Sequence, residues 1–194
     1  MDAKDIATIT LSVLAFCVSA FTAYRTFLAR FRGKVWFSNR IVLTHIDKVP
    51  SLGLACFFEN SGALPGILDD LRAKVEQKDS GTTSYFFPML MRTDYSIFRA
   101  YSDSDWYPFS MISLPPNHRA DKYLLLKPQN DQFVAVKGDM IVSLELRWHN
   151  QKEWRLVTPS LHFALTDEIA SNWNDPATPA YQIISNEVMM QRRQ

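Results

Sequence analysis

The residues that most often carry out chemistry are few in this chain and widely spaced. The four histidines are His45, His118, His149 and His162. No two of them, and no histidine and cysteine, stand at the spacing of metal ligands. The sequence therefore predicts no metal ion and no other cofactor.

Three further side chains could serve as an acid, a base or a nucleophile. Asp69 and Asp70 are adjacent, so on a strand we expect them to point to opposite faces and not to act as a pair. Cys56 lies beside Phe57 and Phe58, where a thiol usually behaves as a small buried hydrophobic group. We expect all three to be structural.

The sequence also lacks the local motifs of common enzyme classes. It has no Gly-x-Ser-x-Gly, no His-Glu-x-x-His and no phosphate-binding glycine loop, and it contains only six glycines. An enzyme would instead need several of Asp69, His118, Asp121 and His162 to meet in one cleft. We therefore predict a protein that is not an enzyme.

One segment has the composition of a binding surface. Residues 92–109 are rich in aromatic side chains and arginine, which dominate the energetics of protein interfaces. The candidate partner-binding residues are Tyr95, Phe98, Arg99, Tyr101, Trp106 and Tyr107. The alternative is that many of these aromatic side chains pack in the domain and the rest belong to a solvated loop.

Nucleic acid is not an expected partner. The net charge of the 194-residue chain is +1, and its basic residues are thinly spread after position 34. Binding to a phosphate backbone requires an extended cationic face. The two cysteines, Cys17 and Cys56, provide no disulfide framework for the soluble part, which fits a reducing compartment.

The element that places all these residues is an apolar N-terminal run. Residues 6–24 are nineteen positions without a charged side chain. As a helix at about 1.5 Å per residue this run spans roughly 28 Å, close to the roughly 30 Å hydrocarbon core of a bilayer. A cleaved signal peptide, disfavoured by the acidic start, and a buried globular helix are the alternatives. We favour a single transmembrane helix.

The charges that flank this run predict its orientation. Asp2 and Asp5 precede it, whereas several basic residues follow it. By the positive-inside rule the N-terminus faces outward and the main domain lies in the cytoplasm. The residues expected at the membrane interface, in contact with lipid, are Tyr24, Arg25, Arg30, Arg32, Lys34 and Trp36. Small side chains in the run, such as Ala15 and Ser19, would allow two such helices to approach closely, so a homo-oligomer is also possible.

After position 34 the hydrophobic period changes from helical to alternating, which is typical of strands. The clearest shared face is Met140, Val142, Leu144, Leu146 and Trp148. A second is Leu52, Leu54, Cys56 and Phe58. Further strands are expected at 35–46, 84–91, 109–114 and 122–126. Many short strands separated by turn residues predict a mainly β protein, an antiparallel immunoglobulin-like β-sandwich of two sheets.

Two stretches are harder to read. A polar turn at 149–153 is followed by Trp154, Leu156 and Thr158, which we interpret as the inward face of the second strand of a hairpin. This strand continues past Pro159 through Leu161, Phe163 and Leu165, with a bend or a sheet edge at the proline. Residues 67–76 fit a helix or a strand, and we predict a strand because Pro65-Gly66 makes a suitable turn before it.

The last thirty residues differ from the rest. Thr166 is placed to cap a short helix that runs to Trp173. Tyr181, Ile184 and Val188 have the spacing of one face of a final helix. We therefore divide the chain into an anchor with its basic flank (1–34), a β-sandwich domain (35–165) and a tail of short helices (166–194). The tail either packs on the sandwich or binds a partner.

The anchor is followed by a strand that ends at Asn60-Ser61-Gly62 and then by Leu64-Pro65-Gly66-Ile67-Leu68-Asp69-Asp70-Leu71. Over residues 5–165 this order of elements resembles a family of uncharacterised bacterial single-pass membrane proteins that carry one immunoglobulin-like domain. It implies the fold and a bacterial inner-membrane location. It implies no activity and no catalytic residue.

Two functions follow as hypotheses. The first is a membrane-tethered, non-enzymatic interaction domain on the cytoplasmic face, which binds a protein partner as a subunit of a larger assembly. The alternative is a sensor or effector whose β-sandwich binds a small ligand while the anchor clusters in the membrane.

Overall fold

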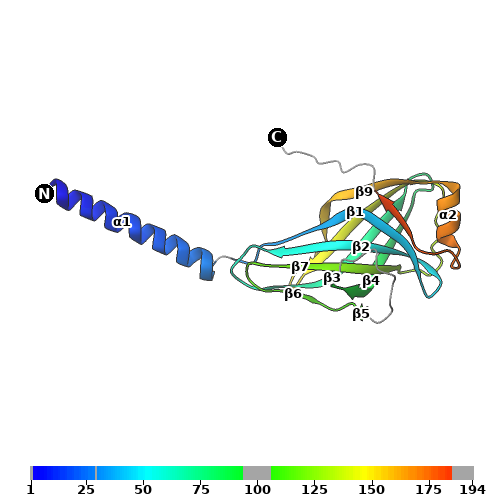
Figure 1. Ribbon diagram of the computed structural model, residues 1–194, viewed down its shortest axis with the longest axis horizontal. Coiled ribbons are helices and arrows are strands. Elements are labelled where there is room, and N and C mark those ends of the chain that lie inside the picture. Colours follow the sequence, from blue (N-terminus) through cyan, green and yellow to red (C-terminus); the bar gives the residue numbers. More distant parts are fainter. Residues whose placement is uncertain (1, 29, 94–105, 185–194) are drawn as a thin grey trace.

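The structure is a computed structural model that describes residues 2–28, 30–93 and 106–184. A long helix projects from one end of an elongated β-domain, and a short helix lies at the opposite end (Figure 1). We call these the anchor-proximal end and the distal end of the domain. The helices are α1 (Ala3–Ala23), the π-helical turn η1 (Tyr24–Leu28) and α2 (Asp167–Asn174).

The domain is built almost entirely from antiparallel strands. These are β1 (Gly33–Ile46), β2 (Val49–Asn60), β3 (Gly66–Gln77), β4 (Thr82–Arg92), β5 (Tyr107–Pro108), β6 (Ile112–Leu114), β7 (His118–Pro128), β8 (Gly138–Trp148), β9 (Arg155–Leu165) and β10 (Tyr181–Ile184). The mainly β prediction, with an apolar N-terminal helix and a short C-terminal helix, is confirmed.

Hydrogen bonding joins all the described strands in one sheet. The order is β10-β1-β2-β7-β4-β3-β8-β9, with β5 paired to β4 and β6 paired to β3. The sheet folds over itself so that β1 and β9, which are not neighbours in this order, come close together. The β-sandwich is therefore nearly a barrel, with the two sheets we expected connected by continuous pairing.

The alternating faces predicted from the sequence form the core. All four residues of the 52–58 face and all five of the 140–148 face belong to one buried cluster between the folded halves of the sheet. Leu52, Leu54 and Cys56 are completely inaccessible to solvent. Each fully buried aliphatic side chain of this kind stabilises the fold by roughly 1.5–3 kcal/mol.

The inward face of β9 differs from our interpretation. Val157 is buried at 5% exposure, whereas Leu156 is 56% exposed. Val157 is in phase with Leu161, Phe163 and Leu165, which are also buried. The register against β8 shifts between Val142 and Leu144, opposite Pro159, so the expected bend at the proline is present. We misassigned the phase because only three alternating residues preceded the proline.

Residues 67–76 form a strand, as predicted, but β3 and its neighbour β4 separate along their length. β3 pairs with β4 only from Ala73 to Gln77 and with β6 from Gly66 to Leu68. Toward the same end β4 pairs with β5 at Leu90 and Met91. The short strands β5 and β6 thus fill the opening between two diverging strands.

The C-terminal segment is partly as expected. Thr166 caps α2, since its hydroxyl accepts a hydrogen bond from the Ile169 amide at 3.2 Å. Trp173 is buried at 2% exposure, and its indole N–H donates to the Ser51 carbonyl at 3.2 Å. The final helix through Tyr181 and Ile184 is wrong: residues 181–184 are a strand paired with residues 40–43 of β1. Val188 lies outside the described residues.

Candidate functional site

The N-terminal helix leaves its apolar surface uncovered. The span Lys4–Phe27 is 24 residues long, has a mean hydropathy of 2.0 and buries no part of itself in the protein. Thr8, Thr10, Ser12 and Thr22 donate their hydroxyls to the carbonyl four residues earlier, each at 2.8 Å. Since these polar groups are satisfied inside the helix, they do not prevent burial in an apolar medium. Length and composition fit a membrane span, and a secretion signal meets the same two criteria.

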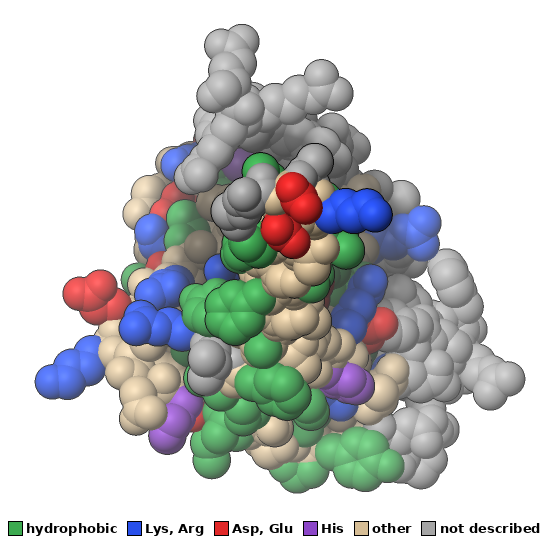
Figure 2. All heavy atoms as spheres, turned by 90° about the vertical axis from the view of Figure 1, so that its left-hand side faces the viewer, with side chains coloured by type: hydrophobic (Ala, Val, Ile, Leu, Met, Phe, Trp, Pro, Cys, Tyr) green, Lys and Arg blue, Asp and Glu red, His purple; other side chains and the backbone are tan. Residues whose placement is uncertain are grey.

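The residues expected at the membrane interface lie on three consecutive segments. Tyr24 and Arg25 belong to η1 and are exposed, and Arg30 and Arg32 are exposed in the segment that follows. Lys34 and Trp36 lie near the beginning of β1. Figure 2 looks along α1 onto this end of the molecule and shows Lys and Arg side chains on both sides of the helix.

The segment between helix and domain is held by Asn60, the last residue of β2. Its Oδ1 accepts from the amides of Arg32 at 3.3 Å and Gly62 at 2.9 Å. Its Nδ2 donates to the carbonyls of Leu64, Leu114 and Pro115 at 2.8 to 3.2 Å. Asn60 is completely buried, so it ties the anchor segment to two loops of the domain at a point that excludes water.

An aromatic contact supports the same junction. The Phe31 ring meets Trp148 edge to face, with 4.8 Å between ring centroids and 70° between planes. A Cβ at Gly66 would overlap the Phe31 ring, and one at Gly62 would overlap the Arg30 carbonyl oxygen. Both glycines are thus required for the close approach of the anchor segment. The helix is joined to the domain by a short, docked connection.

Trp36 belongs to a surface cluster rather than to this connection. Its ring stacks on Phe57 of β2, with centroids 5.9 Å apart and planes 10° apart. The Arg119 guanidinium lies 5.2 Å from each of the two ring centroids and pairs with Asp121 at 3.0 Å. This is a cation–π arrangement near the anchor-proximal end, where β1, β2 and β7 run side by side.

Of the candidate partner-binding residues, Tyr95, Phe98, Arg99 and Tyr101 lie outside the described residues. Trp106 packs on the outer face of the sheet, 5.7 Å from Tyr123 between centroids and 4.9 Å from the Arg92 guanidinium. It belongs to a small apolar cluster around Val42, Ala55, Tyr123 and Leu125. Tyr107, in β5, is 61% exposed. Of the two candidates that the structure describes, Trp106 is therefore packed and Tyr107 is accessible.

Exposed apolar side chains gather beside Tyr107. Met89 is 48% and Met111 is 65% exposed. The Phe109 amide donates to the Met89 carbonyl at 2.9 Å, which holds the two chain segments together. We call Met89, Tyr107 and Met111 the β5 edge. Flexible methionines next to an aromatic residue are common at surfaces that adapt to a partner.

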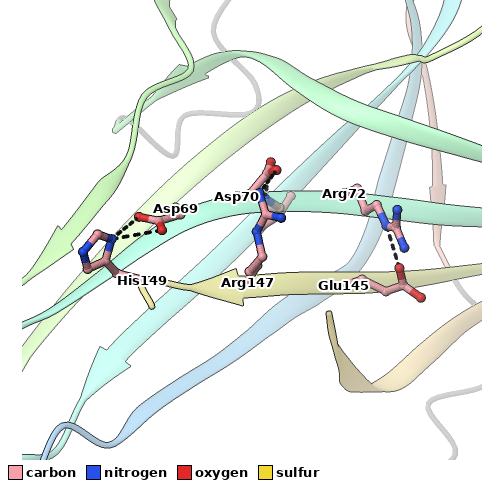
Figure 3. Close-up of polar contacts among 7 residues, drawn as sticks. Asp69, Asp70, Arg72, Glu145, Arg147 and His149 are labelled. Carbon is pink, nitrogen blue, oxygen red and sulfur yellow. Dashed lines mark hydrogen bonds and ion pairs between the residues drawn. The ribbon is translucent and has the colours of Figure 1, made fainter. Parts of the chain in front are cut away.

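A row of polar pairs joins β3 to β8 and to His149, the residue after β8, on the outer face (Figure 3). Arg72 pairs with Glu145 at 2.7 Å, Asp70 with Arg147 at 3.1 Å, and Asp69 with His149 at 3.0 Å. The Arg72 guanidinium also lies 4.2 Å from the centroids of both Tyr85 and Trp154. Arg72–Glu145 and Asp70–Arg147 are cross-strand pairs of opposite charge, which stabilise the pairing of two long strands, and a hydrogen bond joins Asp69 to His149 beside them.

The adjacent aspartates do not point to opposite faces. The register between β3 and β8 shifts at Asp69, so Leu68 and Leu71 are both buried while Asp69 and Asp70 are both on the outer side. A bulge inserts one residue and changes the alternation, and this one has no clear signal in the sequence. Because each carboxylate has its own basic partner, the pair still has no free acid or base.

The other reactive side chains are dispersed. Asp121 pairs with Arg119 on β7, His118 begins the same strand, and His162 is on β9. Cys56 is fully buried, as expected, and burial raises the pKa of its thiol far above the usual range. Within the described part of the chain, no group of three His, Cys, Asp or Glu side chains is arranged to hold a metal ion.

A cleft of about 490 Å³ opens at the distal end. Its walls come from the β3–β4 turn, the start of β4 and the segment after β7. They carry hydroxyl and amide groups, including Ser80, Thr83, Gln129 and Gln132, together with Tyr85 and Phe133, and no charged side chain. This cleft could not be predicted from sequence patterns because its residues come from three separate segments.

Comparisons with known proteins do not assign this chain to a family. No protein-family model matches the sequence, and no curated protein is significantly similar to it. Several solved structures are weakly similar to this chain. A family 123 glycoside hydrolase from Clostridium perfringens has 10% identity and a TM-score of 0.38 over 71% of this chain and 27% of its own.

Two further structures have still lower TM-scores. An uncharacterised β-sandwich protein from Clostridium difficile has 10% identity and a TM-score of 0.33, with 73% of this chain and 93% of its own covered. β-Glucosidase 3B from Thermotoga neapolitana has 14% identity and a TM-score of 0.27, with 75% and 20% covered. This chain thus spans about a quarter of the length of the first neighbour. Similarities this weak carry no argument about activity or site.

Proposed function

We propose that this chain is a non-enzymatic interaction domain, tethered by α1 to the cytoplasmic face of a bacterial inner membrane as a subunit of a larger assembly. The observation that carries the proposal is the uncovered apolar span Lys4–Phe27, joined to the domain through the buried Asn60. A helix of this length and apolarity is stable in a bilayer, whereas in water its surface is costly to expose.

The orientation rests on charge. Asp2 and Asp5 precede the span, and Arg25, Arg30, Arg32 and Lys34 follow it. The same end of the domain adds further basic residues, namely Arg119 near the start of β7, Lys152 in the turn after β8 and Arg155 at the start of β9. Each basic residue near an anionic leaflet contributes about 1 kcal/mol of attraction, which favours the cytoplasmic side for this end of the domain.

The partner surface we favour is the β5 edge. It combines accessible apolar side chains with the aromatic segment 92–109, whose remaining candidates are outside the described residues. A photo-crosslinking amino acid at Tyr107 or Met111, introduced in cells, is expected to give a discrete protein adduct. The matched control is Lys137, an exposed residue at the distal end. Adducts at Lys137 alone, or at none of the three positions, would count against this surface.

A second candidate function is favoured by the distal cleft. Its hydroxyl, amide and aromatic lining suits a neutral ligand with several hydrogen-bonding groups, since charged ligands would find no counter-charge there. A ligand that binds only the folded state raises the melting temperature. A thermal-shift screen of neutral sugars and nucleosides therefore tests the sensor hypothesis, with Gln132→Ala as the variant that should lose the shift. No shift with any compound would remove the support.

A further inference from the structure

The nearly closed sheet leaves a cleft between β1 and β9 at the anchor-proximal end. Its volume is about 310 Å³. One wall is formed by residues 33–36 of β1, and the other by residues 155–158 of β9 together with Leu146. This volume is at the lower limit of the roughly 300–1,000 Å³ of small-molecule sites, so the cleft has room for one small group. We call this cleft the seam.

Two basic side chains of the seam have no partner among the described residues. Lys34 and Arg155 are exposed, and neither makes an ion pair or a side-chain hydrogen bond with a described residue. Arg155 is paired with the buried Leu146 of β8, so it projects from the same side of the sheet as the core. Because β9 begins at this residue, the guanidinium lies at the mouth of the domain and not inside it.

The described residues that line the seam include no acid. Three acidic residues are near it in register or sequence. Glu145 lies on the neighbouring strand β8 and already pairs with Arg72 at 2.7 Å. Glu59 is opposite Lys34 on β2, and Glu153 is in the turn before β9, but neither makes an ion pair with the cations of the seam. Both cations are therefore available to an anion from outside the protein.

The rest of the seam is apolar and partly uncovered. Leu156 is 56% exposed, and Val35 is half-buried. At Gly33 the surface is aromatic, since a Cβ there would overlap the rings of Phe31 and Trp148. Positive charge thus lies next to accessible apolar surface, an arrangement that fits an anionic group carried on an apolar body.

The seam lies where the anchor meets the domain. Gly33 is the fifth residue after Leu28, the last residue of η1, so the two are at most about 18 Å apart. Phe31, which packs on Trp148 beside the seam, belongs to the connection itself. When α1 spans a bilayer, the seam is close to the headgroups of one leaflet. Lipid phosphates are then the anions at the highest local concentration.

We propose that the seam binds the phosphate of an anionic phospholipid, of which phosphatidylglycerol is a simple example. The proposal rests on the proposed tether, because the tether brings the domain to the lipid. The Arg155 guanidinium donates two parallel hydrogen bonds to the phosphate, Lys34 adds a second positive charge, and the Thr158 hydroxyl donates a further bond. Leu156 and Val35 cover the glycerol and the first methylene groups. Since the described walls offer no acid to an ammonium group, phosphatidylethanolamine is the weaker ligand.

A photoreactive phosphatidylglycerol in nanodiscs tests the site with the full chain, and mass spectrometry of the digested chain maps the adducts. We expect adducts at residues 33–36 and 155–158. Arg155→Gln should reduce them at least about tenfold, since charge-assisted hydrogen bonds are lost, and Lys34→Gln on the opposite wall should act in the same direction. The matched control is Lys152→Gln, which removes a positive charge from the preceding turn but not from the seam. It should change the yield about twofold at most.

An equal loss of adducts in Arg155→Gln and Lys152→Gln would show general attraction to lipid and overturn the proposal. Equal labelling by a phosphatidylcholine probe with the same photoreactive group would also overturn it. Excess soluble glycerol phosphate should leave the labelling unchanged. If it removes the labelling, the seam is a site for soluble phosphate esters and the assignment to lipid is wrong.

The same experiment separates the seam from the tether on which it rests. A full chain that does not enter nanodiscs would refute the tether, and the lipid site with it. A chain that enters nanodiscs but fails the comparison of variants would refute the lipid site alone.

Discussion

The two ends of the β-domain are closed in different ways. At the anchor-proximal end a buried amide, Asn60, gathers the anchor segment and two loops through five hydrogen bonds, and Phe31 packs on Trp148. At the distal end α2 closes the core with one large ring, Trp173, and an uncharged cleft stays open beside it. The first end is constructed to fix a connection, whereas the second leaves room for contact with other molecules.

The two ends of the domain also differ in charge. Basic side chains dominate around the helix, whereas α2 and its neighbouring loops carry more acids than bases among the described residues. The distal acids are Asp47, Asp79, Asp131, Asp139, Asp167, Glu168 and Asp175, against Lys48, Lys78, Lys127 and Lys137. In the proposed arrangement the basic end faces an anionic membrane and the acidic end faces away from it, so electrostatic attraction favours the same orientation as the tether.

Removal of the distal ring should have the largest effect on stability. Trp173→Ala deletes a side chain that is 2% exposed and lies 5.3 Å from the Phe133 centroid. We expect a loss of about 3–5 kcal/mol in the free energy of unfolding, measured by denaturant titration in detergent. Trp154→Ala, on the outer face, is the control and should cost clearly less. Similar losses for the two variants would mean that α2 does not close the core.

An asparagine at each end allows a direct comparison of the two closures. Asn60→Ala leaves two amides and three carbonyls without their partner at a buried site, and we expect a loss of about 3 kcal/mol. Asn174 is half-buried and makes two hydrogen bonds, both with the backbone of Ala135, so Asn174→Ala should cost about 1 kcal/mol. The same titration measures both, and the reverse order would contradict the role given to Asn60.

Two ion pairs with the same nitrogen–oxygen distance show how solvent exposure changes the energy of an ion pair. Arg72–Glu145 and Lys137–Asp167 both have 2.7 Å between nitrogen and oxygen, but the first pair is about 20% exposed and the second mostly exposed. Double-mutant cycles should give a coupling energy of about 0.5–1 kcal/mol for the first pair and none that is measurable for the second. Coupling that is equal in the two pairs would show that burial on the β3–β8 face has no effect.

The smallest predicted effect is a dependence on pH. Lys74 is the main cause, with Lys78, of a pKa of Glu76 below its ordinary value. The ionised Glu76 side chain therefore stabilises the fold fully above the ordinary glutamate pKa of about 4.3. This contribution is lost as the pH falls through the lower pKa of Glu76 in the folded protein. Wild-type protein should lose slightly more stability than Glu76→Gln between pH 6 and pH 3. A difference that is independent of pH would rule out this assignment.

Sequence periodicity could predict the parts of the fold in which one rule acts over many residues. The faces of β2 and β8 follow strict alternation over a full strand, so their burial was readable from the residues alone. Thr166 likewise predicts the start of α2, because an N-cap is a local interaction. Long alternation and local caps need no knowledge of the partner element.

The misassigned parts depend on distant partners or on irregular pairing. Leu156 is a hydrophobic residue on the outer face, and only the register against β8 places Val157 inside instead. Tyr181 and Ile184 are three residues apart, a helical spacing, yet a short strand forms there because the edge of β1 is free to pair. The sequence marks Asn60 as a turn residue, but its partners at Leu114 and Pro115 are more than fifty residues away.

Labelling of single cysteines in intact cells shows whether α1 is an uncleaved tether and whether the domain lies in the cytoplasm. Asp2→Cys and Lys152→Cys are made separately with Cys17→Ser, and the cells are treated with a membrane-impermeant thiol reagent before and after permeabilisation. We predict that Asp2→Cys is labelled in intact cells and Lys152→Cys only after permeabilisation, with the intact mass of the chain unchanged. Labelling of Lys152→Cys in intact cells, or a mature chain that begins beyond residue 24, would contradict the proposed tether.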